Sequence, residues 1–134
     1  MKKQVVKLKD VRQPSTGFNH VIKAGNFIFL SSQLSTNLKT GKILLGDIKM
    51  QTKKAMDNIK YLLKQCDCTM DDIVKTVIYF RNTEDRKEIN EIYRHYFTKG
   101  QEPVKVSVQA PSPINGIDIE IEVIAVTANA APLQ

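Results

Sequence analysis

Two alternating stretches near the C-terminus decide the fold: Val104-Lys105-Val106-Ser107-Val108-Gln109 and Ile117-Asp118-Ile119-Glu120-Ile121-Glu122-Val123. Each alternates strictly between apolar and polar residues, which is the period-two pattern of a β-strand with two different faces. The six residues between them, 111–116, include the turn signal Asn115-Gly116 but make a longer loop than a two-residue hairpin. The pattern predicts a β-rich platform from which Lys105, Ser107 and the carboxylates of the second strand project together. We expect a polar site on this platform.

The size and composition of the chain are those of one globular domain over residues 1–134. Hydrophobic residues make up 42% and charged residues 25%, which argues against intrinsic disorder. No apolar run approaches the roughly 20 residues that span a bilayer, and the N-terminus lacks the apolar core of a secretory signal. Cys66 and Cys68 are too close in sequence for a useful disulfide, which favours a reducing compartment. We therefore expect a cytoplasmic protein with no membrane segment.

The net charge of +6 raises the question of a nucleic-acid partner. The basic residues are spread along the chain, with one modest cluster in the first twelve residues. No aromatic residues are interleaved with them in the manner of an RNA-binding motif. A solvated basic surface therefore explains the charge better than nucleic-acid binding does.

The remaining elements follow from periodicity and from capping signals. Strands are predicted over 3–9, 20–24, 27–31 and 73–80, and the run Phe27-Ile28-Phe29-Leu30 predicts burial on both faces of its strand. Asp47 is a good N-cap for a helix that runs to about Cys66. A second helix is expected to start at Asn82-Thr83 and to stop at Lys99-Gly100. Residues from Asn129 onward are expected to form a frayed tail.

The predicted order is β-β-β-α-β-α-β-β, an α+β fold in which two helices cover one face of a mixed sheet. Three of the predicted strands, 27–31, 73–80 and 117–126, carry apolar residues on both parities. An apolar sheet face without helices is an association surface. The pattern therefore predicts a homo-oligomer whose sheets pack together, with polar clefts at the subunit boundaries.

Strings along nearly the whole chain, residues 16–126, resemble the RidA (YjgF) family of reactive-intermediate deaminases, also described as endoribonuclease L-PSP proteins. The resemblance rests on their order and spacing: Gly25-Asn26-Phe27-Ile28-Phe29-Leu30-Ser31-Ser32-Gln33-Leu34, Thr40-Gly41-Lys42 before Asp47-Ile48, Gln51-Thr52 with Asn58-Ile59, Asp72-Ile73-Val74-Lys75-Thr76-Val77, Ile89-Asn90-Glu91-Ile92-Tyr93 with Tyr96-Phe97, and Ile119-Glu120-Ile121-Glu122-Val123-Ile124-Ala125-Val126.

The resemblance implies a chorismate-mutase-like fold, with a mixed six-stranded sheet, two helices on one face and three subunits around a central barrel. It implies ligand clefts between subunits. It also implies hydrolysis of 2-imino acids to 2-keto acids and ammonia, with no metal site and no organic cofactor.

The resemblance also implies a set of site residues, with three departures from the family pattern. Lys105 stands where the family has the Arg that clamps the substrate carboxylate, and a lysine lacks the planar fork for bidentate binding. Phe18 replaces a Tyr of the early loop, and Ser107 replaces a Cys. Three further site positions are retained: Ser31, Asn90 and Glu120. Glu120 is expected to orient the attacking water and to be the catalytic residue, and the other residues are expected to bind substrate.

Each of these residues also has a plainer interpretation. Lys105 either binds a ligand carboxylate or pairs with Glu120 or Glu122 across the sheet, and a Schiff-base lysine is a third option. Glu120 is otherwise half of a solvated acidic face, Ser31 a turn former, and Phe18 a packing residue in its loop.

The functional hypothesis is a cytoplasmic homotrimer that binds a small carboxylate-bearing metabolite and hydrolyses reactive enamines or imines. The departures at Lys105 and Phe18 predict weaker activity or a different substrate. One alternative is a family member that binds and senses a small metabolite without deaminating it. A second is a ribonuclease or translation inhibitor, although the two histidines, His20 and His95, lie in different predicted elements and do not form a general-base pair, and no stacking platform for bases is present.

Overall fold

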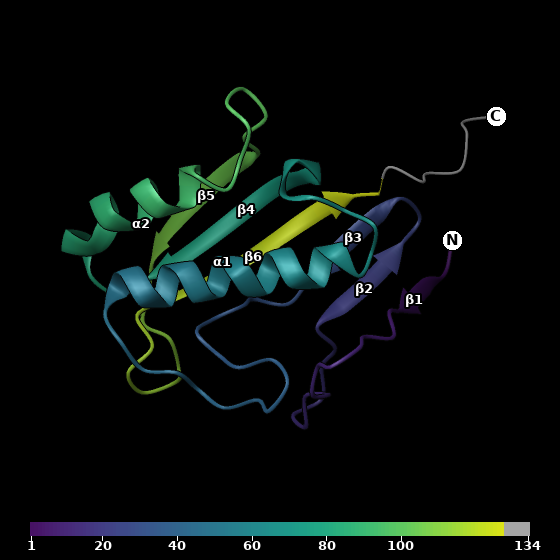
Figure 1. The fold of residues 1–134 in the computed structure, drawn as a ribbon, viewed down its shortest axis with the longest axis horizontal. Helices are drawn as coiled ribbons and strands as arrows, with labels where there is room; N and C mark the ends of the chain where they lie inside the picture. The colour runs from purple at the N-terminus through teal and green to yellow at the C-terminus, as the bar shows by residue number, and fades with distance from the viewer. Residues whose placement is uncertain (128–134) are drawn as a thin grey trace.

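Six strands form one mixed sheet in the computed structural model, which describes residues 1–127 (Figure 1). The predicted frayed tail from Asn129 lies outside the described residues. The strands, in chain order, are β1 (Lys3–Val5), β2 (Val21–Ala24), β3 (Phe27–Leu30), β4 (Ile73–Phe80), β5 (Val104–Gln109) and β6 (Ile119–Val126). Their order across the sheet is β1-β2-β3-β6-β4-β5. The element order and the mixed six-stranded sheet agree with the prediction from sequence.

Helix α1 (Ile48–Lys64) lies along the sheet and supplies much of the core (Figure 1). The Oδ1 of Asp47 accepts a hydrogen bond from the backbone N–H of Met50 at 2.9 Å, so the predicted N-cap is confirmed. The buried face repeats at helical spacing and includes Ala55, Met56, Ile59, Leu62 and Leu63, none of which is exposed to solvent. The helix ends two residues before the predicted Cys66.

Helix α2 (Arg86–Arg94) is shorter than the sequence predicts. Residues 83–85 form a 3₁₀ turn, and the side chain of Asn82 makes no capping hydrogen bond. Ile89 and Tyr93 are buried, and the hydroxyl of Tyr93 donates to Thr76 Oγ1 at 2.9 Å, which ties the helix to β4. Within α2 only Ile89 and Tyr93 are buried, because the residues of its first turn are polar. The regular helix therefore spans only the middle of the range that the sequence predicts.

Strand β4 lies between β5 and β6, so the two alternating stretches that define the fold are not neighbours. β4 pairs in parallel with β5 and antiparallel with β6. Ile78 stands opposite Ser107 on one side and opposite Ile121 on the other. Because residues in register across a sheet share a face, Ser107 lies on the helix-covered face with Ile78 and Ile121, and Glu120 lies on the opposite face. The prediction of one shared polar platform was therefore wrong.

The face of the sheet that lacks helices is partly apolar. Ile28 and Leu30 of β3 are buried, but Phe27 and Phe29 are 45% and 41% exposed. The prediction that this strand is buried on both faces was therefore wrong for the single chain, because both helices lie on one side (Figure 1). Val106 of β5 is 46% exposed on the same open face. We refer to this surface, made of Phe27, Phe29, Val77, Val104, Val106 and Val108, as the open apolar face.

Candidate functional site

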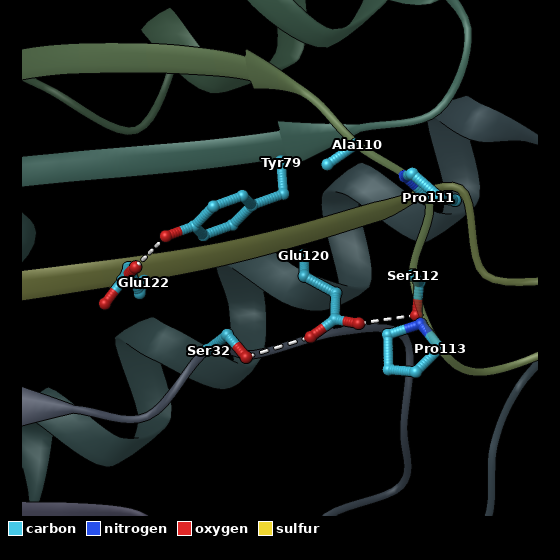
Figure 2. A pocket seen from close by; sticks show the side chains of 8 residues that line it. All are labelled: Ser32, Tyr79, Ala110, Pro111, Ser112, Pro113, Glu120 and Glu122. Atoms are coloured by element: carbon cyan, nitrogen blue, oxygen red, sulfur yellow. Dashed lines mark hydrogen bonds between the residues drawn. The ribbon is translucent and has the colours of Figure 1, made fainter.

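A polar cavity of about 310 Å³ lies on the open side of the sheet, beside the C-terminal end of β4. It is lined by Ser32, Tyr79, residues 110–113, Glu120 and Glu122 (Figure 2). Strand alternation places both carboxylates in this cavity, since Glu120 stands opposite Tyr79 and Glu122 opposite Val77. The loop after β5 closes one side of it. The cavity thus combines two carboxylates with three hydroxyl groups, and none of its lining residues is basic.

Glu120 is held by two serine hydroxyls that approach from different segments of the chain. Ser32 Oγ donates to Glu120 Oε1 at 2.9 Å, and Ser112 Oγ donates to Glu120 Oε2 (Figure 2). Each carboxylate oxygen has two acceptor positions, so each can still accept a hydrogen bond from a ligand or a water. A fixed carboxylate with spare acceptor positions is suited to orienting a water molecule.

Glu122 is paired with Tyr79, which lies diagonally across from it on β4. The phenolic hydroxyl of Tyr79 donates a short hydrogen bond to Glu122 Oε1 (Figure 2). This hydrogen bond, with some burial, raises the pKa of Tyr79 above its usual value. Tyr79 therefore keeps its proton at neutral pH and remains a donor to the carboxylate.

Lys105 projects to the other side of the sheet, toward α2. Its Nζ donates to Asn90 Oδ1 at 3.1 Å and lies 5.0 Å from the centre of the Tyr93 ring. Partial burial lowers the pKa of Lys105, and the positive charge of Arg86 lowers it further. Two of the predicted substrate-binding residues, Lys105 and Asn90, are thus brought together at the edge of the sheet, with Ser107 on the same face.

Lys105 and Glu120 do not meet within one chain. They lie on opposite faces of the sheet, and β4 separates their strands. The interpretation that Lys105 pairs with Glu120 or Glu122 across the sheet was therefore wrong. Its register partner is Thr76, and its hydrogen bond goes to α2.

The other two predicted residues, Phe18 and Ser31, lie at or next to a second cavity of about 460 Å³, and Ser32 lines both cavities. Phe18 lines this cavity and is 45% exposed, with its ring edge-on to His20 at a centroid distance of 6.0 Å. Burial lowers the pKa of His20, although a hydrogen bond with the backbone of Arg12 opposes this effect. Ser31 Oγ donates to the backbone carbonyl of Asn19 at 2.7 Å, and this bond fixes the loop that carries Phe18.

Four residues of the polar cavity were not among the site residues predicted from the sequence: Ser32, Tyr79, Ser112 and Glu122. The alternation of Glu120 and Glu122 did predict that the two carboxylates project together, but Glu122 was not assigned to the site. The pairing of Tyr79 depends on which strand neighbours β6, which the sequence does not state. Ser112 stands between two prolines in a loop, where no periodicity indicates its direction.

Two features were sought in the described part of the chain: side chains grouped to hold a metal ion, and a helix able to span a membrane. Within residues 1–127, no group of three or more His, Cys, Asp or Glu side chains is arranged to hold a metal ion. Over the same residues, no helix is long and apolar enough to cross a membrane. Cys66 and Cys68 are free thiols.

The fold and sequence of this chain are similar to those of known proteins. A family model described as endoribonuclease L-PSP matches residues 9–127. A RutC family protein of Pyrococcus abyssi is 35% identical over 125 residues, which cover 93% of this chain and 98% of the relative. A 2-iminobutanoate/2-iminopropanoate deaminase of the mite Dermatophagoides farinae is 27% identical over 92% of this chain and 96% of its own length.

The same relationship holds for a solved structure. The crystal structure of a Rid-family protein of unknown function from Yersinia pestis superposes with a TM-score of 0.86 and 31% identity, over 94% of this chain and all of the other. The sequence match is thus accompanied by a shared fold over 94% of this chain. The chain therefore belongs to the RidA (YjgF) family, also called the endoribonuclease L-PSP family.

Proposed function

We propose that this protein is a Rid-type deaminase of the cytoplasm that hydrolyses 2-imino acids, or their enamine tautomers, to 2-keto acids and ammonia. The observation that carries the proposal is Glu120, a carboxylate held by two hydroxyls in a polar cavity on the open side of the sheet. The activity named for the mite relative supports the choice of substrate class.

Hydrolysis of an imine requires a water molecule to be directed at an electrophilic carbon. The water oxygen adds to the imine carbon, and one of its protons is transferred to the nitrogen. When the carbon–nitrogen bond breaks, the proton of the new hydroxyl also passes to the nitrogen, which leaves as ammonia, and the oxygen becomes the keto group. Glu120 accepts a hydrogen bond from this water and can carry the proton during the transfer, which needs no redox step.

A second requirement is a cation for the carboxylate of the substrate, and Lys105 is the proposed group. It cannot reach the same ligand as Glu120 within one chain, because the two side chains point to opposite faces of the sheet. Lys105 does lie on β5, the edge strand, where a neighbouring subunit can approach. We therefore place the cleft between subunits: Lys105, Asn90 and Ser107 from one subunit face Glu120 and the loops of Ser31 and Phe18 from the next.

The open apolar face supports an oligomer. Exposed phenylalanines and valines on a sheet without a covering layer form an association surface. Most homo-oligomers have closed symmetry, and a head-to-tail contact of the kind proposed, Lys105 of one subunit against Glu120 of the next, closes into a ring in which every boundary is equivalent. A homotrimer, with three clefts, is the assembly that we propose.

The test generates 2-iminobutanoate in place with threonine dehydratase and follows its trapping by semicarbazide. The active protein should reduce the amount of trapped imine and speed up release of 2-oxobutanoate. Lys105→Arg should raise this activity, because a guanidinium binds a carboxylate with two parallel hydrogen bonds whereas an ammonium offers a point charge.

The assay also separates the proposal from its alternatives. An inactive wild-type protein whose Lys105→Arg variant is active would indicate a family member that binds metabolites without deaminating them. Inactivity of both would exclude the proposed cleft. An RNA-directed role would instead require binding to a mixed RNA pool that weakens steeply as salt increases.

A further inference from the structure

The two hydroxyls that donate to Glu120 belong to Ser32 and Ser112, which are far apart in the sequence. Each of these two segments is also held in place by contacts that do not involve Glu120. Ser32 precedes Gln33, whose backbone N–H donates to Ile121 O at 2.7 Å and whose carbonyl accepts from Ile121 N at 2.9 Å. This isolated bridge joins the segment of Ser32 to β6. It fixes both Ser32 and Glu120, because each is next to one of the two bridged residues. Gln33 itself is buried, and its side-chain amide donates to Ser31 O at 3.1 Å.

Ser112 is anchored from the other side of the cavity. It lies between Pro111 and Pro113, whose rings restrict the backbone, and its carbonyl accepts from Arg81 Nη2 at 3.5 Å. Arg81 is in turn paired with Asp118 at 3.1 Å, just before β6 begins. The loop after β5 is thus joined to the strand that carries Glu120.

The direction of the Ser112 hydroxyl follows from its second hydrogen bond. The backbone N–H of Ile114 donates to Ser112 Oγ at 3.1 Å, so the oxygen acts as an acceptor toward the loop. A serine hydroxyl has one proton, and the proton of Ser112 therefore points at Glu120 Oε2 (Figure 2). The loop thereby delivers a fixed donor to the carboxylate, as Ser32 does at the other oxygen.

We propose that Ser32 and Ser112 are positioning residues, which hold Glu120 in one orientation so that its remaining acceptor positions meet the attacking water. This inference rests on the proposed deaminase function. A carboxylate on a strand otherwise rotates about its side-chain bonds, and two donors from opposite sides select one rotamer. In the proposed cleft, Lys105 of the neighbouring subunit binds the substrate carboxylate, so the effect of the two serines is expected on the chemical step and not on binding.

The test compares kcat and KM for 2-iminobutanoate hydrolysis in Ser112→Ala, Ser112→Thr and Ser32→Ala. Loss of one charge-assisted hydrogen bond should lower kcat roughly tenfold for each alanine variant and leave KM within about twofold. Ser112→Thr keeps the hydroxyl and should retain most of the activity. Thr83→Ala, which removes an exposed hydroxyl from the turn before α2, is the control and should match the wild type.

A double-mutant cycle separates positioning from a general structural effect. In a Glu120→Gln background, adding Ser112→Ala should cause no further loss, because the group that Ser112 positions is already disabled. A further tenfold loss in that background would overturn the inference, and so would an unchanged kcat or a loss confined to KM. If the wild-type protein does not accelerate imine hydrolysis, both the inference and the proposed function fail. If it does while the serine variants match it, only the inference fails.

Discussion

Gln51 offers a sharp test of how the helix layer supports the candidate site. This side chain on α1 is fully buried and makes three hydrogen bonds to backbone groups. Its Nε2 donates to Gly46 O at 3.0 Å and to Gly116 O at 2.9 Å, and its Oε1 accepts from the N–H of Asp118 at 2.9 Å. Gln51 therefore ties the helix to the loop that leads into β6, two residues before Glu120.

Replacement of Gln51 by Leu keeps the approximate size of the side chain and removes all three hydrogen bonds. Each bond contributes about 1 kcal/mol net, so the loss is about 3 kcal/mol, and the added apolar burial offsets part of it. With an unfolding entropy of about 2 cal/mol/K per residue over a chain of this length, the expected decrease in Tm is roughly 7–10 °C. The loop that leads into β6 should also become less ordered, because Gln51 no longer holds Gly116 and Asp118. Deaminase activity should therefore decrease.

The assay is thermal unfolding by circular dichroism at matched protein concentration, because oligomer formation makes Tm depend on concentration. Lys49→Leu is the matched control, since Lys49 is an exposed residue of the same helix. We expect its Tm to stay within about 2 °C of the wild type. If Gln51→Leu also stays within that range, the three hydrogen bonds do not support the fold as argued.

Three further predictions concern the core, the free thiols and the open apolar face. Tyr93→Phe removes the hydrogen bond to Thr76 but keeps the ring beneath Lys105, so denaturant titration should show a loss of about 1 kcal/mol, and an unchanged stability would contradict the role of that bond. Burial raises the pKa of the Cys68 thiol to about 11 from an ordinary value near 9. The folded protein therefore holds this proton more tightly than the unfolded chain does, and the stabilisation from the protonated thiol is complete below pH 9 and is lost as the pH rises toward 11. Cys68→Ala should flatten the fall in stability over that window, and a fall identical to the wild type would exclude this contribution. Phe29→Asp places a charge on the open apolar face and should yield smaller particles in sedimentation velocity, whereas an unchanged assembly would show that this face is not an interface.

The sequence carried most of the fold because each element has a strong local signal. The cap at Asp47, the apolar stripe of α1 and the strict alternation of β5 and β6 all correspond to what the structure contains. The ends of α2 were misplaced, because its polar first turn adopts a 3₁₀ turn that helix periodicity does not distinguish from an α-helix.

The sequence predicted much less of the site. Alternation indicates that a strand has two faces, but it does not indicate which strands are neighbours. β4 lies between β5 and β6, and the registers of its two neighbours place Lys105 and Glu120 on opposite faces of the sheet, where the sequence had predicted one shared face. The role of Ser112 could be recognised only from the structure, because its hydrogen-bond partner, Glu120, is eight residues away on the following strand.

In the proposed trimer, each cleft combines Lys105 of one subunit with Glu120 of the next. This arrangement is tested most directly with hybrids of two variants, Lys105→Ala and Glu120→Gln, each of which should be inactive alone. When the two chains are mixed at equal amounts in a trimeric ring, about a quarter of the boundaries should unite an intact Lys105 with an intact Glu120. We predict that the mixed protein, after unfolding and refolding together, recovers about a quarter of the wild-type rate of 2-iminobutanoate hydrolysis. Mixed protein that is no more active than the separate variants would contradict a site shared between subunits.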